Sequence, residues 1–536
     1  IRNAAKQAVA DGVFPAGEIP AITLEVPPKK ELGDFATNFA MQSARVFRLP
    51  PHRIAEEIVR RLSLEELERA EIAGPGFINV FLRAEVLYEE LEQAIAAGES
   101  YGTLMAKERE PIMVEYVSAN PTGPLHVGHG RGAAVGSALV NLLRVAGYPV
   151  RSEYYINDAG NQIETLAASV NARYLELFGQ PAELPENGYH GADIIDTAKR
   201  IAEKDGDRYL ALSEEEREVA LKEKLAALRE DLSRFNVRFD VWFSERTLHP
   251  AKVTDAIAKL RENGTIYEKD GALWLRSTDY GDDKDRVVIR ENGEPTYLAA
   301  DIAYHRDKFE RGFGTLVDIW GADHHGYVCR VKAAMKALGY DPEKLRILLL
   351  QMVSLYRGGE PVKMSKRTGE SVTLAELIEE VGTDAARYFF VMRSLDSQLD
   401  FDLDLARKQS NENPVYYVQY AHARIASIFR QAEEIRLTVE EDPDLTRLTD
   451  ETEIALIKLI TEYPDEVDRA AADYAPQRIA RFAHDLAGAF HSFYSKCRIM
   501  GVDEPLAKAR LALAGKTQQV IRHALGILGV SAPEKM

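Results

Sequence analysis

Ala119-Asn-Pro-Thr-Gly-Pro-Leu-His-Val-Gly-His129 is the stretch of this chain that decides its fold. The apolar run just before it, 113–117, predicts a strand, and the Asn, Pro and Gly residues predict a turn. A helix is then expected to open near His126 and to run to Gly147. An opening helix points free backbone N–H groups into the turn, and such groups suit phosphate. The stretch therefore predicts a nucleotide-binding turn between a strand and a helix.

Two histidines mark the start of this helix. His126 and His129 are three residues apart, so they share one face of the first turn. There, their imidazoles could donate hydrogen bonds to phosphate oxygens. The nearby glycines are expected to leave the helix surface bare, so that a nucleotide can lie against it: Gly128, Gly130, Gly132 and Gly136. Such histidine pairs are common on helices, so this pair needs support from elsewhere in the chain.

Lys363-Met-Ser-Lys-Arg367 gives that support. Glycines flank this basic stretch, which predicts a flexible loop whose two ammonium groups close over a triphosphate. A basic pentapeptide alone is weak, because most such runs are solvated surface. The conjunction of the turn and the loop, with strands and helices between them, indicates that the protein binds a nucleoside triphosphate. The loop residues expected to contact this nucleotide are Met364, Ser365 and Lys366.

These two stretches resemble the signature motifs of class I aminoacyl-tRNA synthetases, with Val127 where isoleucine is usual. That exchange is a conservative apolar one. Further segments resemble the bacterial-type arginyl-tRNA synthetases, and the likeness covers the whole chain. The segments are Gly33–Asn38, Gly74–Asn79, Val114–His129, Tyr154–Gln162, Tyr297–Asp301 and Trp320–Gly326.

The resemblance implies a two-step reaction. The arginine carboxylate attacks the α-phosphorus of ATP to give arginyl-adenylate and pyrophosphate, and a terminal ribose hydroxyl of tRNA(Arg) then takes the arginyl group. Members of this family need bound tRNA for the first step. The catalytic residues implied are His126 and His129, which hold the triphosphate, and Lys363 and Lys366, which neutralise the charge that builds as pyrophosphate leaves. We expect Mg²⁺ to arrive with ATP, and no protein-bound structural metal.

Arginine itself needs a different set of residues. A guanidinium is planar and permanently charged, so its pocket should offer a carboxylate that accepts two parallel N–H bonds. Asp301 is the first candidate, and the alternative is a surface carboxylate paired with Arg306 or Lys308. By resemblance, Tyr297 lines the side-chain pocket one helical turn from Asp301. The other arginine-binding candidates are Glu115, Ser118, Asn120, His129 and His324.

Three blocks can be separated along the chain. Residues 1–105 combine helices expected at 34–47 and 52–62 with strands at 21–26 and 77–82, which predicts a small α/β module. By resemblance this module binds the outer corner of tRNA. Residues 401–536 carry four long helical patterns, at 414–432, 452–472, 477–496 and 506–528. They predict an all-α bundle, which by resemblance binds the anticodon.

The middle block, 106–400, alternates strands with helices. Strands are expected at 112–117, 150–156, 316–320 and 347–352. This alternation predicts an α/β fold with a doubly wound parallel sheet, the Rossmann-type arrangement that binds nucleotides at the carboxyl ends of its strands. An insertion is expected at about 161–295, with a polar helix at 214–235 and a hairpin at 272–290.

Composition limits the remaining possibilities. A chain of 536 residues is too long for a single core, and 46% hydrophobic and 28% charged residues are ordinary for a soluble protein. No apolar run suits a membrane span or a signal peptide, so we expect a cytoplasmic protein. We also expect a monomer. The start at Ile1 leads us to expect a few preceding residues. The two cysteines, Cys329 and Cys497, lie far apart in the sequence, which excludes a disulfide framework. A zinc site at His324, His325 and Cys329 is not expected, because a fourth ligand with suitable spacing is absent.

The net charge of −18 does not exclude a nucleic-acid partner, because phosphate responds to the local field of a groove. Two other functions stay open at this point. A small-molecule nucleotidylyltransferase uses a similar histidine turn, but generally without a long helical C-terminal region. A non-catalytic synthetase-like RNA-binding protein would have lost the histidines or lysines, and all four are present.

Overall fold

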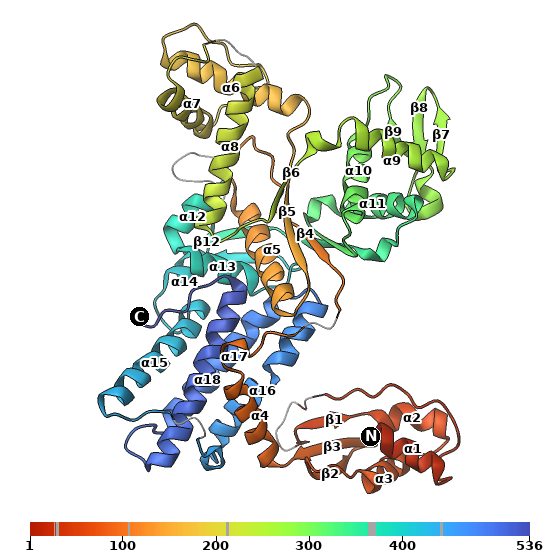
Figure 1. The fold of residues 1–536 in the computed structure, drawn as a ribbon, viewed down its shortest axis with the longest axis vertical. Helices are drawn as coiled ribbons and strands as arrows, with labels where there is room; N and C mark the ends of the chain where they lie inside the picture. Colours follow the sequence, from red (N-terminus) through yellow and green to blue (C-terminus); the bar gives the residue numbers. More distant parts are fainter. Residues whose placement is uncertain (26, 28–31, 106–107, 211–213, 363–370, 440–442) are drawn as a thin grey trace. The chain divides into compact units, whose positions relative to one another are not determined.

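The structure of this chain, a computed structural model, describes residues 1–536 apart from 26, 28–31, 106–107, 211–213, 363–370 and 440–442 (Figure 1). It divides into two compact units. The first unit contains residues 1–98, 439–461 and 501–512, and the second contains 99–438, 462–500 and 513–536. The block boundaries expected near residues 105 and 400 remain predictions.

The N-terminal part of the first unit is a small α/β module. Its antiparallel sheet has the order β1-β3-β2. Aromatic and aliphatic side chains, among them Phe14, Phe39 and Phe47, form its core. The elements are α1 (Arg2–Ala10), β1 (Phe35–Thr37), α2 (Phe39–Phe47), α3 (Pro51–Arg61), β2 (Leu67–Ala73), β3 (Phe77–Leu82) and α4 (Ala84–Ala96).

Two expectations for this module were wrong. Only the later part of the helix predicted at 34–47 is helical. Phe35–Thr37 form strand β1, which pairs with β3, and α2 begins at Phe39. The strand predicted at 21–26 is reduced, in its described part, to an isolated bridge between Glu25 and Ala36. At residues 35–37, pairing with the distant strand β3 decides the structure. A local pattern cannot reveal that pairing.

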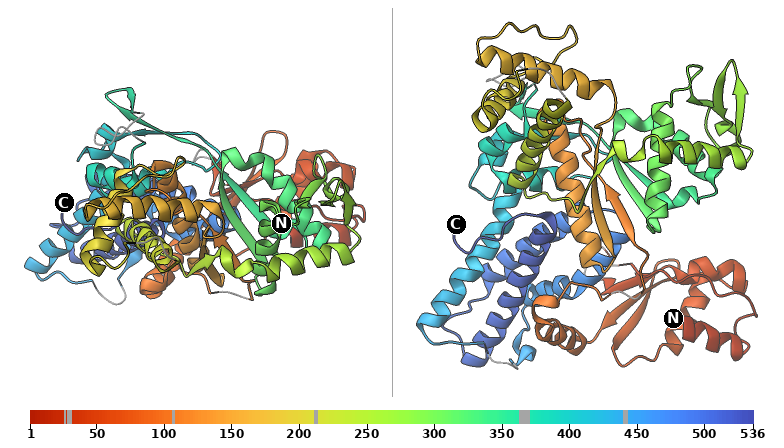
Figure 2. Two further views of the ribbon diagram at one scale, coloured as in Figure 1. Left: turned by 90° about the horizontal axis from the view of Figure 1, so that it is seen from above. Right: turned by 45° about the horizontal axis from the view of Figure 1, so that its top comes forward.

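A parallel five-stranded sheet, in the order β11-β10-β4-β5-β6, forms the centre of the second unit. All four residues of the central strand β4 are buried, so both faces of the sheet are covered there. Helix α5 lies on one side of the sheet, and α10 and α11 on the other (Figure 1 and Figure 2). This confirms the predicted doubly wound sheet. The elements are β4 (Ile112–Glu115), α5 (Val127–Val145), β5 (Val150–Ile156), β6 (Val241–Ser244), α10 (Tyr297–Glu310), β10 (Thr315–Gly321), α11 (His325–Leu338) and β11 (Leu345–Leu350).

The sequence led us to expect that four glycines leave the surface of α5 bare for a nucleotide, but three of them, Gly130, Gly132 and Gly136, are buried. A Cβ atom on Gly136 would lie 2.3 Å from the ring of Tyr116, and one on Gly130 would lie 2.8 Å from Leu374 Cδ1. Gly132 is also buried, against Leu350. These glycines let the helix pack closely on its own sheet and on neighbouring side chains.

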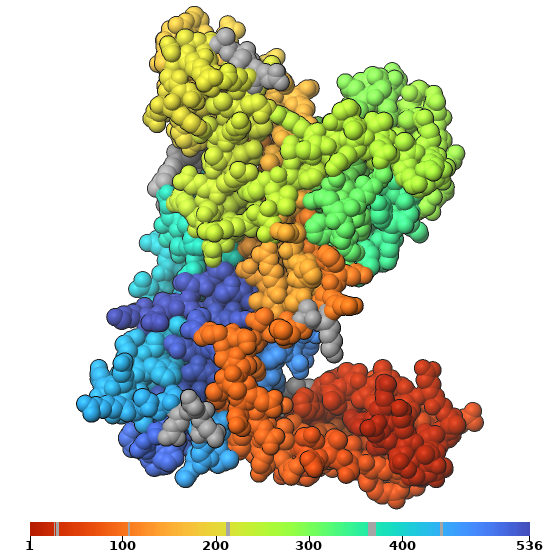
Figure 3. Space-filling model, viewed as in Figure 1, coloured from red at the N-terminus to blue at the C-terminus, as the bar shows by residue number. Residues whose placement is uncertain are grey.

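Strand β6 lies within the stretch 161–295 that was expected to be one insertion. It pairs with β5 at the edge of the sheet, so the chain makes two excursions. The first is helical, and its amber and yellow atoms present a large exposed surface in Figure 3. It contains α6 (Asn161–Leu177), α7 (Ala192–Asp205) and α8 (Glu214–Arg234). The second contains α9 (Ala251–Glu262) and the antiparallel strands β7 (Ile266–Lys269), β8 (Ala272–Leu275) and β9 (Arg286–Ile289).

The chain continues through a small sheet into a helical region. The first part contains β12 (Val353–Arg357), β13 (Glu360–Val362), α12 (Leu374–Val381), α13 (Thr383–Val391), β14 (Leu399–Asp402) and α14 (Leu403–Arg407). The predicted all-α region follows as α15 (Pro414–Glu434), α16 (Glu451–Ala472), α17 (Gln477–Lys496) and α18 (Glu504–Leu528). Short 3-10 helices lie at Gly98–Ser100, Glu245–Leu248, Ser277–Tyr280, Ala322–His324, Pro342–Lys344 and Leu445–Arg447.

Side chains of the second unit cap the carboxyl end of α18. Asn141 Nδ2 donates to Ile527 O at 3.1 Å. The fully buried Arg387 donates to Leu528 O at 2.8 and 3.0 Å, where a cation also suits the negative end of the helix dipole. Gly529 follows at φ +68°, and a Cβ atom there would lie 2.3 Å from Arg387 Nη2. The end of this helix is therefore built around an arginine from α13.

Candidate active site

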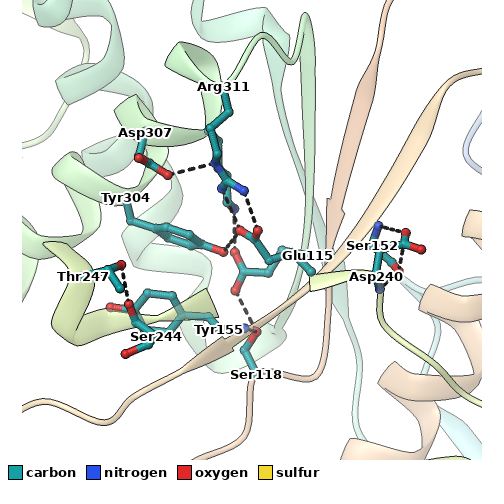
Figure 4. A network of polar contacts seen from close by, with 12 residues as sticks. Glu115, Ser118, Ser152, Tyr155, Asp240, Ser244, Thr247, Tyr304, Asp307 and Arg311 are labelled. Atoms are coloured by element: carbon teal, nitrogen blue, oxygen red, sulfur yellow. Dashed lines mark hydrogen bonds and ion pairs between the residues drawn. The ribbon is translucent and has the colours of Figure 1, made fainter. Parts of the chain in front are cut away.

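A strained turn follows the central strand β4. Val117 and Ser118 have φ values of 68° and 42°, and Ser118 N donates to Tyr116 O at 3.0 Å. A hydrogen bond between residues two apart, around a β-branched residue at positive φ, is a rare and strained geometry. It turns Ser118 Oγ toward Glu115 Oε1, to which it donates at 2.8 Å, and it lets Oγ accept from Tyr155 N at 3.1 Å (Figure 4). The end of β4 thus presents fixed polar groups.

His126 and His129 cap the helix that opens after this turn. His126 Nδ1 accepts from Gly128 N at 3.1 Å and from His129 N at 3.4 Å, and His129 Nδ1 accepts from His126 N at 3.3 Å. The N–H groups that we expected to be free for phosphate are therefore occupied by the histidines themselves. The N–H of Val127 is also used, because it donates to Val372 O at 3.3 Å.

This capping fixes the protonation of both rings. A neutral imidazole whose Nδ1 accepts a hydrogen bond carries its proton on Nε2. Burial lowers the pKa of His126, and burial together with the neighbouring His126 lowers the pKa of His129 to about 4. At neutral pH both rings are therefore uncharged. Each offers one Nε2–H donor, and the two rings stack with centroids 3.7 Å apart.

The predicted lysine loop lies outside the described residues, since Lys363, Met364, Ser365 and Lys366 belong to the range 363–370. The chain just after this range returns to the histidine turn. Leu374 N donates to Leu125 O at 2.7 Å, and His126 forms an isolated bridge with Thr373. Residues 372–374 are therefore fixed beside the residues that open α5.

A buried charge network lies beneath the end of β4. Lys308 Nζ is fully buried and donates to Glu115 Oε2 at 2.6 Å and to Asp318 Oδ1 at 2.9 Å. His305 Nε2 lies 2.7 Å from Asp318 Oδ2, and its Nδ1 lies 2.7 Å from the backbone oxygen of Asp301. Both partners of His305 can only accept, so the ring carries two protons and a positive charge. Two carboxylates and two cations balance one another here.

The Asp301 carboxylate has no cation of its own in this network. Burial, with Glu115 and Glu245 nearby, raises the pKa of Asp301 to about 6, although His305 and a hydrogen bond from Tyr327 oppose the rise. The predicted alternative partners are engaged elsewhere. Arg306 pairs with Asp255 and Glu310, while Lys308 holds Glu115 and Asp318. Asp301 is thus a partly buried anion without an ion-pair partner among the described residues.

Sequence reasoning missed two residues that face Asp301. The hydroxyl group of Tyr155 donates to Glu245, and burial raises the pKa of both residues. Tyr155 therefore stays protonated and remains a donor. Glu245 is only 7% exposed and lies just after β6, in a stretch that showed no motif. Tyr155 belongs to the motif Tyr154–Gln162, where its position in a strand could have marked it.

The other predicted arginine-binding residues are more exposed. Asn120 Oδ1 accepts from Asn157 Nδ2 at 3.2 Å. Tyr297 is 73% exposed at the start of α10. The ring of His324 packs edge-on to Trp320 at 6.4 Å and is also largely exposed. The structure brings Glu115, Ser118 and Asp301 together around Tyr155. Asn120, Tyr297 and His324 lie nearer to solvent. The roles of all these residues stay predictions.

No group of three or more His, Cys, Asp or Glu side chains is arranged to hold a metal ion within the described part of the chain. His324, His325 and Cys329 are each exposed. No described helix is both long enough and apolar enough to span a membrane.

Comparison with known families gives three matches along the chain. The model "Arginyl tRNA synthetase N terminal domain" matches residues 1–82, "tRNA synthetases class I (R), catalytic domain" matches 90–396, and "DALR anticodon binding domain" matches 418–536. With the doubly wound sheet and the histidine-capped helix, they define a class I aminoacyl-tRNA synthetase. An arginine–tRNA ligase from Carboxydothermus hydrogenoformans is 53% identical, over 99% of this chain and 97% of that protein. The chain belongs to the arginyl-tRNA synthetases.

Further relatives agree with this family. An arginine–tRNA ligase from Geobacillus thermodenitrificans is 52% identical, over 100% of this chain and 98% of its own length. The solved arginyl-tRNA synthetase of Thermus thermophilus superposes with a TM-score of 0.78 at 25% identity, over 100% of this chain and 99% of that one.

Proposed function

We propose that this enzyme is an arginine–tRNA ligase, which activates L-arginine with ATP and transfers it to the 3′ end of tRNA(Arg). One observation carries the choice of amino acid. The buried cations beside β4 are balanced by Glu115 and Asp318, whereas Asp301 and the neighbouring Glu245 have raised pKa values. Asp301 has no ion-pair partner among the described residues, and Glu245 has only the His249 ring, whose Nε2 lies 3.4 Å from its Oε1, so these carboxylates favour a cationic ligand.

The arginine pocket is built around these carboxylates. Asp301 accepts two N–H groups of the guanidinium, and Glu245 accepts another. Tyr155 and Tyr327 donate to the two carboxylates and so fix their direction. The amino-acid end of arginine lies against Glu115, Ser118, Asn120 and His129. Tyr297 and His324 contact the substrate from the mouth of the pocket.

ATP binds at the start of α5. His126 and His129 donate through Nε2–H to triphosphate oxygens, and Gly128 allows the phosphates to approach. Because both imidazoles are neutral, they supply hydrogen bonds but no positive charge. Charge must come from Lys363 and Lys366, with Met364 and Ser365 completing the loop over the nucleotide. Mg²⁺ accompanies ATP and is held mainly by phosphate oxygens.

Positioning and charge stabilisation carry the reaction. The arginine carboxylate attacks the α-phosphorus, so no protein nucleophile is needed. Lys366 acts as the pyrophosphate leaves, and a ribose hydroxyl of the tRNA then attacks the adenylate carbonyl. We further propose that the enzyme is a cytoplasmic monomer, that residues 1–105 bind the tRNA corner, and that residues 401–536 bind the anticodon region.

Charging of a tRNA pool with each amino acid in turn tests the function. Arginine alone should be attached, with formation of AMP and pyrophosphate. A nucleotidylyltransferase would release pyrophosphate without tRNA, and a non-catalytic RNA-binding protein would give no product. Charging of another amino acid in preference to arginine would overturn the proposal.

Pyrophosphate exchange tests the order of events. By family resemblance, exchange with arginine and ATP alone should be negligible and should appear when tRNA(Arg) is added. Strong exchange without tRNA would exclude tRNA-dependent activation, yet it would leave the ligase function standing.

A further inference from the structure

Glu245 is held on both sides by a single residue, Asp158. Ser244 Oγ donates to Asp158 Oδ2 at 2.6 Å, and Arg246 N donates to Oδ1 at 3.1 Å. Arg246 Nε also donates to the backbone oxygen of Asp158 at 2.7 Å. Asp158 is only 7% exposed, and each of its carboxylate oxygens is used. The residues before and after Glu245 are thus tied to one buried side chain.

These contacts occur where the regular strand pairing stops. Ile156 of β5 and Ser244 of β6 form the last pair of the parallel ladder. Beyond it the chain enters the short 3-10 helix Glu245–Leu248, and the ladder can no longer fix its direction. A buried carboxylate that accepts from both flanks replaces the missing ladder bonds.

The direction of this short helix determines where Glu245 points. Its carboxylate accepts from Tyr155 on the neighbouring strand and lies close enough to Asp301 to raise the pKa of that residue. A guanidinium that binds two carboxylates requires both at a fixed separation. A binding group must be held within roughly 0.5 Å of its productive position, and neighbouring hydrogen bonds are what hold it.

We propose that Asp158 is a positioning residue for arginine recognition, which acts by fixing the turn that carries Glu245. The proposal rests on the arginine pocket described above. Both carboxylate oxygens of Asp158 are engaged by Ser244 and Arg246, so in this proposal it acts through the turn and makes no contact with arginine or ATP. Its loss should therefore weaken arginine binding through Glu245 alone.

Asp158→Asn is the direct test. An amide at this position can still accept from Arg246 N, but it meets the Ser244 hydroxyl with an N–H₂ group, so the bond to Ser244 reverses its direction and a charge-assisted tie becomes a weaker neutral one. We expect the KM for arginine to rise roughly tenfold, the size expected when one charge-assisted hydrogen bond to the substrate is weakened. The KM for ATP should not change, and kcat with saturating arginine should be largely kept. Ser244→Ala removes the bond from Ser244 Oγ to Asp158 and leaves the buried carboxylate in place. It replaces Asp158→Asn if that variant does not fold.

Asp240→Asn is the matched control. Asp240 ties the same two strands together at the opposite end of β6, where its Oδ2 accepts from Ser152 N at 2.7 Å and from Ser152 Oγ at 3.0 Å (Figure 4). It makes the same kind of contact three residues before Tyr155 on β5, and its Oδ2 also accepts from Arg144 Nη2 at 2.6 Å. Asp240→Asn should lower thermal stability without raising the KM for arginine. If both variants raise that KM equally, Asp158 is merely structural and the inference is wrong.

A double-mutant cycle with Glu245→Gln separates the possible failures. If Asp158 acts through Glu245, adding Asp158→Asn to Glu245→Gln should raise the arginine KM little further. Fully additive effects of the two substitutions on the arginine KM would overturn the inference. An unchanged KM in Asp158→Asn, with a raised KM in Glu245→Gln, would overturn it too. Both results would leave the proposed arginine pocket intact. An unchanged KM in Glu245→Gln would instead show that the proposed pocket is wrong at Glu245, and the inference would fall with it.

Discussion

Replacing Asp301 by asparagine should weaken arginine binding and, at the same time, stabilise the free protein. The burial that makes Asp301 an effective partner for a cation also makes its charge costly when no cation is bound. Its pKa rises from 3.8 to about 6, and a shift of about two units corresponds to roughly 3 kcal/mol against the ionised form at neutral pH. Asp301→Asn removes this cost, in part offset by burial of an amide.

The loss on the binding side is of similar size. Asparagine leaves the guanidinium facing a neutral amide, and removal of one partner from a buried charge pair costs about 2–5 kcal/mol, or a roughly 30-fold or larger rise in KM. Discrimination against citrulline, the uncharged analogue of arginine, should narrow in the same variant, because the lost charge is what preferred the cation. Glu310→Gln is the control, since it makes the same charge change on the exposed side of α10.

Two measurements check this prediction: aminoacylation kinetics with saturating ATP and tRNA(Arg), and thermal melting of the free enzymes. The sign of the pH dependence also follows from the raised pKa. The folded protein holds the Asp301 proton more tightly than the unfolded chain does, so the cost is present above pH 6 and disappears as the pH falls toward 4. The stability advantage of Asp301→Asn should therefore shrink over that range. An unchanged KM for arginine, or a variant clearly less stable than the parent at neutral pH, would refute the reasoning.

Three further predictions concern the lysine loop and helix α5. Lys366→Ala should lower kcat by roughly a hundredfold or more with little change in the KM for arginine, and full kcat would remove Lys366 from the mechanism. Gly136→Ala should destabilise the fold by about 1–3 kcal/mol because its methyl group meets the Tyr116 ring, whereas Gly132→Ala, with its nearest side-chain atom at 3.5 Å, should be neutral or stabilising. Nitrogen NMR of the free enzyme should show His129 protonated on Nε2 alone and titrating near pH 4; a titration near pH 6.5 would contradict the capping geometry.

The periodic elements of the fold could be predicted from the sequence. β3, β5 and α17 occupy the predicted ranges, because each has a strong local pattern of apolar residues. The predictions failed where a distant partner decides the structure. Residues 35–37 become a strand because β3 offers an edge, and β6 belongs to the main sheet because β5 does.

The proximity of some candidate site residues could be predicted, whereas their roles remain predictions. Asp301, Glu115 and Ser118 could be named from motifs, and the structure brings them together. Glu245 could not be found, because only the three-dimensional fold brings it near Asp301. The histidine capping was missed for another reason. A free helix end and an end capped by its own side chains have the same sequence pattern, and only the ring orientation distinguishes them.

The neutral, mutually capped histidines have a consequence for inhibitors of this enzyme. His126 and His129 each offer an N–H donor whose direction is fixed by the capping, so an uncharged acceptor in the right position can still be bound, although by a weaker hydrogen bond than an anionic one. If the two rings bind phosphate oxygens as proposed, an adenylate analogue whose uncharged linker keeps oxygen acceptors where the α-phosphate has them should retain hydrogen bonds to both rings in a weaker form. Such an analogue would exchange some affinity at the start of α5 for membrane permeability.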